Sequence, residues 1–525
     1  MAGRPEGRAV PPTYGMAVNT ALTLPVLRRR HRLATQPFLN VFWIDPQAEK
    51  RRKRSVIGVR FSAATTAGRF LPQRLALRIR PLLGRIDAVL FTADERGEAG
   101  RMSLIAFSIR IISAVIAFVS QVLMARWMGS FEYGIFVLVW VTMVIVGNLA
   151  CLGFHTSVIR FIPEYRERGM LAELRGIVVA SRLFVLVAST VIAGIGALGV
   201  WLCAPWIENY YVVPFILGVI CLPMIAMSDL LQGLARANSW ALFALSPTFL
   251  VRPMLILVFM ALMLLMGYAP DAKTAIFASI AATYATTLGQ LVGVTSRMDR
   301  SIPAGPMRVH FGLWFVVSLP IFLVESFFFL LTNADVLMVG AYLDPDDVAV
   351  YFATVKTLAL VHFVYFAVKA GVAQRYAQFT HGEPEKLAAF ARETVSWTFW
   401  PSLLMALLVL ALGKPMLVLF GPEFTAGYPL LFLLVFGVVA RAAVGPCESL
   451  LTMSGNQNIC AAVYAMTLAF NIGLNVMLIP LFGLWGAAIA TSLAMIFEAS
   501  ALSFTVWRKL GIVMAIFVPA AGGDA

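Results

Sequence analysis

The chain has 525 residues, of which 60% are hydrophobic and only 13% are charged, and its formal net charge is +14. This composition excludes a water-soluble globular protein, because the polar residues are too few to cover a water-facing surface. The apolar runs are unbroken rather than alternating, which also excludes a transmembrane β-barrel. The sequence therefore predicts an all-α polytopic membrane protein.

The first 101 residues are strongly basic. They hold 19 of the 41 Lys and Arg and 7 of the 27 Asp and Glu, so their net charge is +12 and that of the remainder is +2. Clusters such as RRRHR (28–32) and KRRKR (50–54) are typical of a disordered tail that anionic lipid headgroups attract. The alternative is an over-extended gene model, with the working protein starting near Met102. Both interpretations place a boundary after residue 101.

Twelve apolar runs follow, each near the length of about 20 residues that a helix needs to cross a bilayer. They lie near residues 103–125, 134–155, 177–200, 211–234, 244–267, 273–296, 311–334, 348–371, 396–419, 427–449, 458–480 and 484–507. We expect an N-terminal six-helix lobe at 102–300, a C-terminal six-helix lobe at 301–510 and a C-terminal tail at 511–525, with a central cavity between the lobes.

The connections between these runs differ in charge. One side receives thirteen Lys and Arg, and the other side receives only Arg126, Lys273 and Lys414. The positive-inside rule then predicts that both termini are cytoplasmic. We expect the protein in a bacterial inner membrane.

Two pairs of segments indicate an internal repeat. DLLQGLARANSW (229–240) matches ESLLTMSGNQNI (448–459), with an acid at the first position, and MGSFEYGIF (128–136) matches VGAYLDPDDVAVYF (339–352). Each pairing relates a span to the sixth one after it. This pattern predicts two parallel repeats that face each other across a cavity.

Several motifs carry a family resemblance between residue 102 and about residue 510. ARWMGSFEYGIFVL (125–138), ADVLMVGAYLDPDDVAVYFATVK (334–356), FGPEFTAGY (420–428) and NIGLNVMLIPLFGLWGAAIAT (471–491) resemble turns of bacterial polysaccharide exporters. These form the oligosaccharide and polysaccharide flippase branch of a superfamily that also holds multidrug antiporters and the lipid II flippase.

The resemblance implies a flippase that moves an undecaprenyl-pyrophosphate-linked oligosaccharide to the outer leaflet by alternating access. The glycan would be an O-antigen, capsule or exopolysaccharide unit. The partners implied are this lipid-linked glycan, the membrane lipids, and a polysaccharide polymerase with its chain-length machinery. Nucleic acid is not an expected partner.

Charged residues inside the predicted spans are the candidate site. A charge at mid-membrane costs about 2.5–3.5 kcal/mol on insertion scales, so such a residue usually faces a cavity or a partner. The deep cations are Arg110, Arg252, Lys356 and Arg441, and the deep acids are Glu325 and Glu498. We predict that the four cations bind the pyrophosphate, because a cationic cavity suits an anion and the planar fork of arginine matches phosphate oxygens. The alternative for Arg252 and Arg441 is a structural ion pair with a deep acid.

Arg110 and Lys356 are the foremost candidates, since the resemblance implies that spans 1, 2, 7 and 8 line the cavity. Arg182 and Lys369 lie close enough to span ends to snorkel to the interface.

Oxygen-bearing side chains form a second candidate site. Glu325, Asn471, Asn475 and Thr491 would hold a coupling proton or sodium ion if spans 7, 11 and 12 meet, as the resemblance implies. Interhelical hydrogen bonding is the alternative role for the two asparagines. The membrane potential is the alternative driving force. No other cofactor and no metal site is expected.

Two other functions are open to such a chain. A cation-coupled drug or metabolite antiporter of the same superfamily is disfavoured by the excess of deep cations. A membrane polysaccharide polymerase or ligase would need a sizeable outer loop, whereas the longest outer connection lies around 334–347. There is also no Walker motif, HExxH or GxSxG. We therefore expect a transporter rather than an enzyme, with no catalytic residue.

Overall fold

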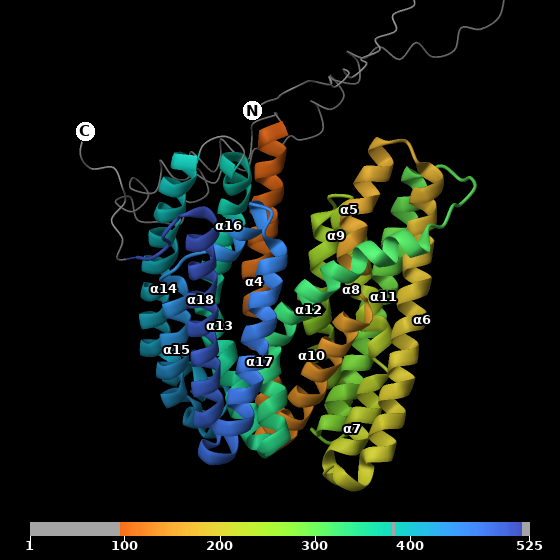
Figure 1. Ribbon diagram of the computed structural model, residues 1–525. Coiled ribbons are helices and arrows are strands. Elements are labelled where there is room, and N and C mark those ends of the chain that lie inside the picture. Colours follow the sequence, from red (N-terminus) through yellow and green to blue (C-terminus); the bar gives the residue numbers. More distant parts are fainter. Residues whose placement is uncertain (1–94, 381–383, 517–525) are drawn as a thin grey trace, which may run out of the picture. The chain divides into compact units, whose positions relative to one another are not determined.

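A computed structural model describes residues 95–380 and 384–516 (Figure 1). Within these ranges the side chains of 95–108, 110, 111, 370, 373, 374 and 384 are not described. Nearly all of the predicted basic tail, most of the C-terminal tail and the side chain of Arg110 thus lie outside the described residues.

The described ranges are helical and contain no strand. The N-terminal half contains α4 (Glu95–Ala150), α5 (Phe154–Glu167), α6 (Leu171–Cys203), η1 (Ala204–Trp206), α7 (Asn209–Val219), α8 (Leu222–Ala237), α9 (Ala241–Ser246), η2 (Pro247–Val251), α10 (Arg252–Leu265) and α11 (Ala272–Ser301). The C-terminal half contains α12 (Phe311–Tyr342), α13 (Pro345–Thr380), α14 (Pro384–Phe420), η3 (Pro422–Gly427), α15 (Tyr428–Ala442), α16 (Cys447–Met453), α17 (Gln457–Phe482) and α18 (Leu484–Leu510).

Ten helices in the described residues are long and apolar enough to cross a membrane, or eleven if the bent pair α7 and α8 forms one span. The first of them, Ile112–Glu167, contains the two arms of α4, which meet at a kink at Gly129, and α5. The first two predicted runs both overlap this stretch, and each later run overlaps another candidate or the bent pair. The predicted class, an all-α polytopic membrane protein, is confirmed.

The kink in α4 occurs at the turn that MGSFEYGIF predicts. Gly129 has φ 76° and ψ 170°, a conformation that side chains disfavour. Just before it, the Arg126 guanidinium donates hydrogen bonds of 2.7 and 2.6 Å to the carbonyl oxygens of Leu419 and Val418, at the end of α14. Just after it, the Tyr133 ring packs edge-on against the rings of Phe352 on α13 and Phe424 on η3. The turn is therefore fixed to the C-terminal half.

Helices α17 and α18 pack closely, as their small residues predict. A Cβ atom added to Gly486 would lie 2.2 Å from the carbonyl oxygen of Leu478, so only glycine fits there. The neighbouring Ala487 and Ala488 are fully buried. This contact brings the first turns of α18 against the last turns of α17.

Helix α12 packs its first half against α5. Trp314 Nε1 donates a 2.8 Å hydrogen bond to the Tyr165 hydroxyl, and the Ser318 hydroxyl donates one of 2.7 Å to Ser157. Trp314 is fully buried in the same apolar cluster as the side chains of α5, α6 and α8. The first half of α12 therefore packs with the N-terminal half of the chain, although it follows the predicted boundary at 300.

Candidate functional site

Five polar side chains are buried together where α12, α13, α17 and α18 meet, and each is at most 8% exposed. The Thr491 hydroxyl donates a 2.9 Å hydrogen bond to Asp335 Oδ2 and lies 3.0 Å from the Tyr351 hydroxyl. The Asn471 side chain lies beside Asp335, and Asn475 Nδ2 donates to the side-chain and backbone oxygens of Asn471 at 3.1 and 2.9 Å. We call this group the buried oxygen cluster: Asp335, Tyr351, Asn471, Asn475 and Thr491.

Local geometry explains why these residues meet. Asn471 and Asn475 are four residues apart on α17, so they lie on one face of that helix. The tight contact at Gly486 holds α18 against α17, and Thr491 follows on α18 five residues later. Asp335 lies inside α12 rather than in the connection after it, because the helix continues to Tyr342.

The buried oxygen cluster has unmet hydrogen-bonding capacity. Asp335 Oδ1 and Asn475 Oδ1 are buried and have no hydrogen-bond partner among the described residues. No described Lys or Arg forms an ion pair with Asp335. A buried carboxylate without a countercharge is costly, so a bound cation or a proton on the carboxyl group would stabilise it.

The donor set suits a hard cation. The described residues contain no group of three or more His, Cys, Asp or Glu side chains that could hold a metal ion. Hydroxyl, amide and carboxylate oxygens, which the buried oxygen cluster does supply, are the ligands that hard cations prefer.

Three of the four residues predicted for a coupling-ion site are thus brought together: Asn471, Asn475 and Thr491. The fourth, Glu325, is not part of this cluster, and Asp335 supplies the carboxylate instead. The predicted outer connection at 334–347 contains Asp335, whereas the structure places this residue inside α12. The apolar run VLMVGAY that follows Asp335 was the available signal that the helix continues.

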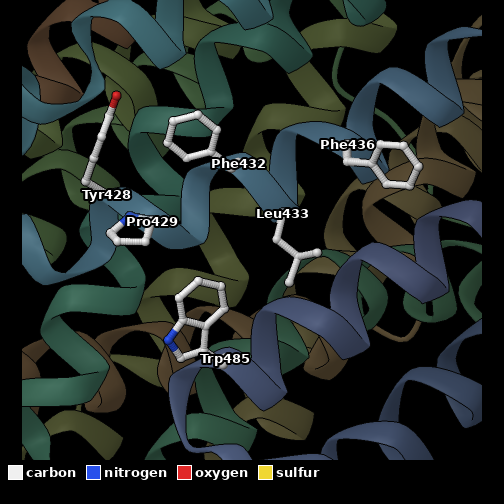
Figure 2. Close-up of a pocket in the computed structure, with 6 residues that line it drawn as sticks. All are labelled: Tyr428, Pro429, Phe432, Leu433, Phe436 and Trp485. Atoms are coloured by element: carbon white, nitrogen blue, oxygen red, sulfur yellow. The ribbon is translucent and has the colours of Figure 1, made fainter.

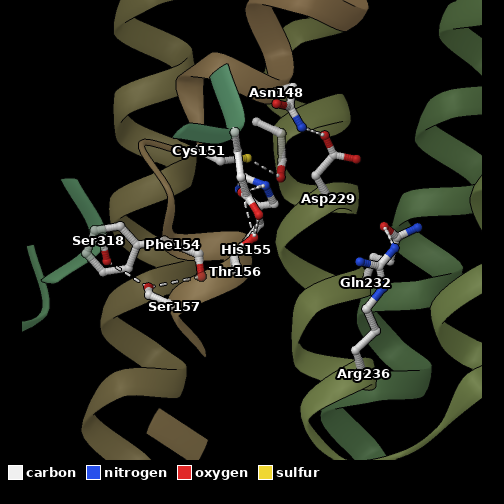
Figure 3. Close-up of polar contacts among 12 residues, drawn as sticks. Asn148, Cys151, Phe154, His155, Thr156, Ser157, Asp229, Gln232, Arg236 and Ser318 are labelled. Atoms are coloured by element: carbon white, nitrogen blue, oxygen red, sulfur yellow. Dashed lines mark hydrogen bonds and ion pairs between the residues drawn. The ribbon is translucent and has the colours of Figure 1, made fainter. Parts of the chain in front are cut away.

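Glu325 instead belongs to a second polar group, in which α4, α5, α8 and α12 meet. The Thr156 hydroxyl lies 2.9 and 2.8 Å from the two Glu325 carboxylate oxygens, and His155 Nε2 lies 3.1 Å from Oε2. On the neighbouring helices, Asn148 Nδ2 donates a 3.2 Å hydrogen bond to Asp229 Oδ2. Figure 3 shows Asn148, His155, Thr156 and Asp229 together with Gln232 and Arg236.

We call the following six residues the polar facet, since each is partly exposed: Asn148, His155, Thr156, Asp229, Gln232 and Glu325.

Arg441 forms a buried ion pair. Its Nη2 lies 2.9 Å from Glu498 Oε1, and its guanidinium lies 4.8 Å from the centre of the Tyr365 ring. The Arg441 and Glu498 side chains are only 8% and 2% exposed. A structural ion pair with a deep acid, one of the two roles considered for Arg441, is the arrangement observed. A guanidinium so enclosed is not open to a lipid-linked glycan.

Arg252 is also buried, with 5% of its surface exposed. It follows the π-helical turn η2, and its Nε and Nη2 have no hydrogen-bond partner among the described residues. No described acid forms an ion pair with it. The structure therefore places two of the four predicted cavity cations, Arg252 and Arg441, inside the protein.

Lys356 differs from both arginines because its side chain is exposed. Its Nζ lies 4.7 Å from the centre of the Phe352 ring, and no described carboxylate is within ion-pair distance. Arg110 lies on α4, but its side chain is outside the described residues. Lys356 is thus the one predicted cavity cation that the described part of the chain shows to be accessible.

Each half of the chain has a hydrogen-bonded carboxylate at the first position of the repeated segment, Asp229 in one and Glu448 in the other. Glu448 Oε2 accepts a 2.5 Å hydrogen bond from the Tyr365 hydroxyl, and its Oε1 lies 3.0 Å from Lys369 Nζ. The repeat pairs Glu448 with Asp229, which accepts its hydrogen bond from Asn148. Lys369, which we expected to snorkel, instead pairs with a buried carboxylate.

The described part of the chain also has an apolar groove of about 510 Å³ between α15 and α18 (Figure 2). Its lining residues are Tyr428, Pro429, Phe432, Leu433, Phe436 and Trp485. The Tyr428 hydroxyl is already bonded to the Leu410 carbonyl oxygen. This groove offers no charge for a pyrophosphate.

The apolar helical spans identify a multi-pass membrane protein, and the charged side chains inside them are typical of functional sites. The chain belongs to the polysaccharide biosynthesis protein family, whose model matches residues 100–373, more than half of the chain. The MatE family model also matches, over residues 320–477. Both matches agree with the resemblance seen in the motifs.

Solved structures share the fold. A multidrug resistance MATE family transporter of the MOP superfamily, in an inward-facing conformation, matches with a TM-score of 0.62, 14% identity, and coverage of 77% of this chain and 94% of that chain. The lipid II flippase MurJ, in an inward closed conformation, matches with a TM-score of 0.56 at 14% identity, over 77% and 87% of the two chains.

A MOP superfamily transporter from Pyrococcus furiosus, described as having a binding pocket of reverse polarity, gives a TM-score of 0.54 at 14% identity, over 78% and 94% of the two chains. No curated protein sequence matches this chain.

Proposed function

We propose that this protein is a transporter, namely a flippase that moves an undecaprenyl-pyrophosphate-linked oligosaccharide from the cytoplasmic to the outer leaflet by alternating access. The carried unit would be an O-antigen, capsule or exopolysaccharide repeat. Membership of the polysaccharide biosynthesis family supports this substrate class. No covalent chemistry is required of the protein.

The observation that carries the proposal is the exposed Lys356. An ammonium group inside a span, with no described carboxylate beside it, attracts an anion. The pyrophosphate of a lipid-linked oligosaccharide is such an anion. In this proposal Arg110 joins Lys356 in holding it, whereas Arg252 and Arg441 hold the helices in place.

We further propose that the buried oxygen cluster binds the coupling cation, either sodium or a proton. Its support is the unpartnered Asp335 Oδ1 beside the Thr491, Tyr351 and Asn471 side chains. The alternative drive is the membrane potential. If about two negative charges move outward, an inside-negative potential of 100 mV favours the step by about 4–5 kcal/mol.

The proposed setting is a bacterial inner membrane with both termini in the cytoplasm. A polysaccharide polymerase and its chain-length machinery would act on the product at the outer face. The loop charges support this orientation, since Lys and Arg are concentrated on one side of the predicted spans.

An alternative is a cation-coupled drug or metabolite antiporter. The MatE match over residues 320–477 favours it, and so do the partly exposed carboxylates Asp229 and Glu325, which would attract an organic cation.

Proteoliposomes distinguish the two functions. Purified protein is reconstituted with lipid-linked oligosaccharides extracted from the source cells, and the glycan reaching the opposite leaflet is measured with an added lectin. A flippase gives protein-dependent lectin access. Export of ethidium without any glycan movement would instead favour the antiporter.

A further inference from the structure

We propose that the polar facet binds the sugar hydroxyls of the substrate, apart from the cations that bind its pyrophosphate. This inference rests on the proposed function and adds to it a second binding surface with its own ligand chemistry. The ligand class is an uncharged, hydroxyl-rich glycan. Figure 3 shows the residues of the facet that α4, α5 and α8 contribute.

The facet is polar where a lipid-facing surface would be apolar. Its six residues come from candidate membrane spans, and every one of them is partly exposed. The Glu325 side chain is 39% exposed, and that of its partner His155 is 17% exposed. Lipid cannot satisfy exposed carboxylates and amides, so such a surface faces water or a polar ligand.

The charge of the facet disfavours pyrophosphate as its ligand. It carries the carboxylates of Asp229 and Glu325, and the described cation beside it, Arg236, donates a 2.8 Å hydrogen bond to Gln232 Oε1. Two carboxylates repel a phosphate group. The exposed cation Lys356 lies on α13, which contributes no residue to the facet. The two parts of an amphiphilic substrate would therefore be held at different places.

The donors and acceptors of the facet match sugar hydroxyls. A hydroxyl both donates and accepts, so it is best bound by a carboxylate next to an amide or hydroxyl group. Asp229 beside Asn148 and Glu325 beside Thr156 provide two such pairs.

Gln232 extends this row on α8. Its Oε1 accepts a 2.8 Å hydrogen bond from Arg236 Nη2, and its buried Nε2 has no hydrogen-bond partner among the described residues. A turn of this partly exposed side chain toward a sugar hydroxyl would supply a bond that the unliganded protein leaves unmade.

Binding to two separate probes tests the inference. The protein in nanodiscs is titrated with inorganic pyrophosphate and with the free oligosaccharide released by mild acid from the lipid-linked pool of the source cells. We expect Asp229→Asn and Gln232→Ala to weaken oligosaccharide binding at least 10-fold and to leave pyrophosphate binding within 2-fold. Lys356→Ala should do the reverse. Glu164→Gln, which alters an acid paired with Arg168 away from the facet, is the matched control.

The outcomes distinguish a failure of this inference from a failure of the proposed function. Suppose that the wild type binds both probes, and that the facet variants, whose elution and Tm show that they are folded, keep full oligosaccharide affinity. The polar facet is then not the sugar-binding surface, and the proposed flippase function is unaffected. Binding of pyrophosphate alone by the wild type also overturns the facet. If the wild type binds neither probe, the proposed function fails. Loss of ethidium binding in Asp229→Asn, with oligosaccharide binding unchanged, would make the facet a cation site.

Discussion

Thr491 and Asp335 are 156 residues apart and are joined by a 2.9 Å hydrogen bond that links α18 to α12 inside the protein. Because Asp335 Oδ1 is left without a partner, a bound cation should stabilise this cluster. A ligand at 100 times its Kd stabilises the folded state by about 2.7 kcal/mol. We expect the Tm of the wild type to rise with sodium at constant ionic strength, and that of Asp335→Asn to stay flat.

Potassium or choline chloride is the control for ionic strength. An equal rise in the Tm of Asp335→Asn would place the sodium effect elsewhere. If sodium has no effect but the Tm and transport respond to pH only when Asp335 is present, the coupling ion is a proton.

Replacement of Glu325 should leave the dependence of transport on the coupling ion unchanged. Glu325 lies outside the buried oxygen cluster and is bonded to Thr156 and His155. Glu325→Gln should therefore keep the sodium or proton dependence of translocation in proteoliposomes, while Asp335→Asn abolishes it. If Glu325→Gln still translocates the substrate but no longer depends on sodium or protons, Glu325 belongs to the coupling-ion site after all.

Lys356→Ala should abolish complementation of a flippase-deficient strain at normal membrane levels, because its exposed ammonium is removed from the span. Lys356→Arg should keep most activity, since the charge remains. Lys414→Ala, which removes another exposed lysine on α14, is the matched control. Full activity of Lys356→Ala would refute its role in binding the pyrophosphate.

Arg110→Ala should also abolish complementation, and Arg110→Lys should restore only part of it because the planar fork is lost. Surface levels are checked by quantitative immunoblot of membranes. Wild-type activity of Arg110→Ala would leave Lys356 as the sole accessible cation among the four predicted.

The Arg441–Glu498 pair gives a prediction about stability. Arg441→Met leaves Glu498 buried and unpaired, which should cost about 3–5 kcal/mol of folding free energy. The double variant with Glu498→Leu should recover most of that loss, because an apolar pair needs no countercharge. Thermal unfolding of purified protein measures both. If the double variant is as unstable as Arg441→Met, the charge pairing is not the cause.

The fold was largely predictable because hydrocarbon thickness imposes long apolar runs, which a sequence displays directly. Boundaries were less predictable: the turn at Gly129 follows from its motif, but Asp335 lies inside a helix, although the predicted run ends at residue 334. A single charged residue lowers the hydropathy of a window without ending the helix.

The candidate site was predictable only in part. Asn471 and Asn475 are related by helical spacing, which a sequence reveals, and Thr491 is joined to them by a short turn. Whether a deep arginine faces a cavity or an acid depends on contacts between distant helices. Arg441 and Glu498 are 57 positions apart in number, and no local pattern relates them. The polar facet was missed for the same reason.

The two hydrogen bonds from Arg126 to the end of α14 bear on how fast the transporter works. Any motion that separates α4 from α14 must break both bonds before water replaces them. Bonds to a charged group contribute about 1.5–3 kcal/mol each when shielded and less at an exposed site such as this one. If both hydrogen bonds are broken before the transition state of this motion, they lengthen the lifetime of the state in which α4 and α14 are in contact. The factor is roughly 10-fold per 1.4 kcal/mol of lost bond energy. Arg126 would then limit the rate of the turnover cycle without contacting the transported substrate.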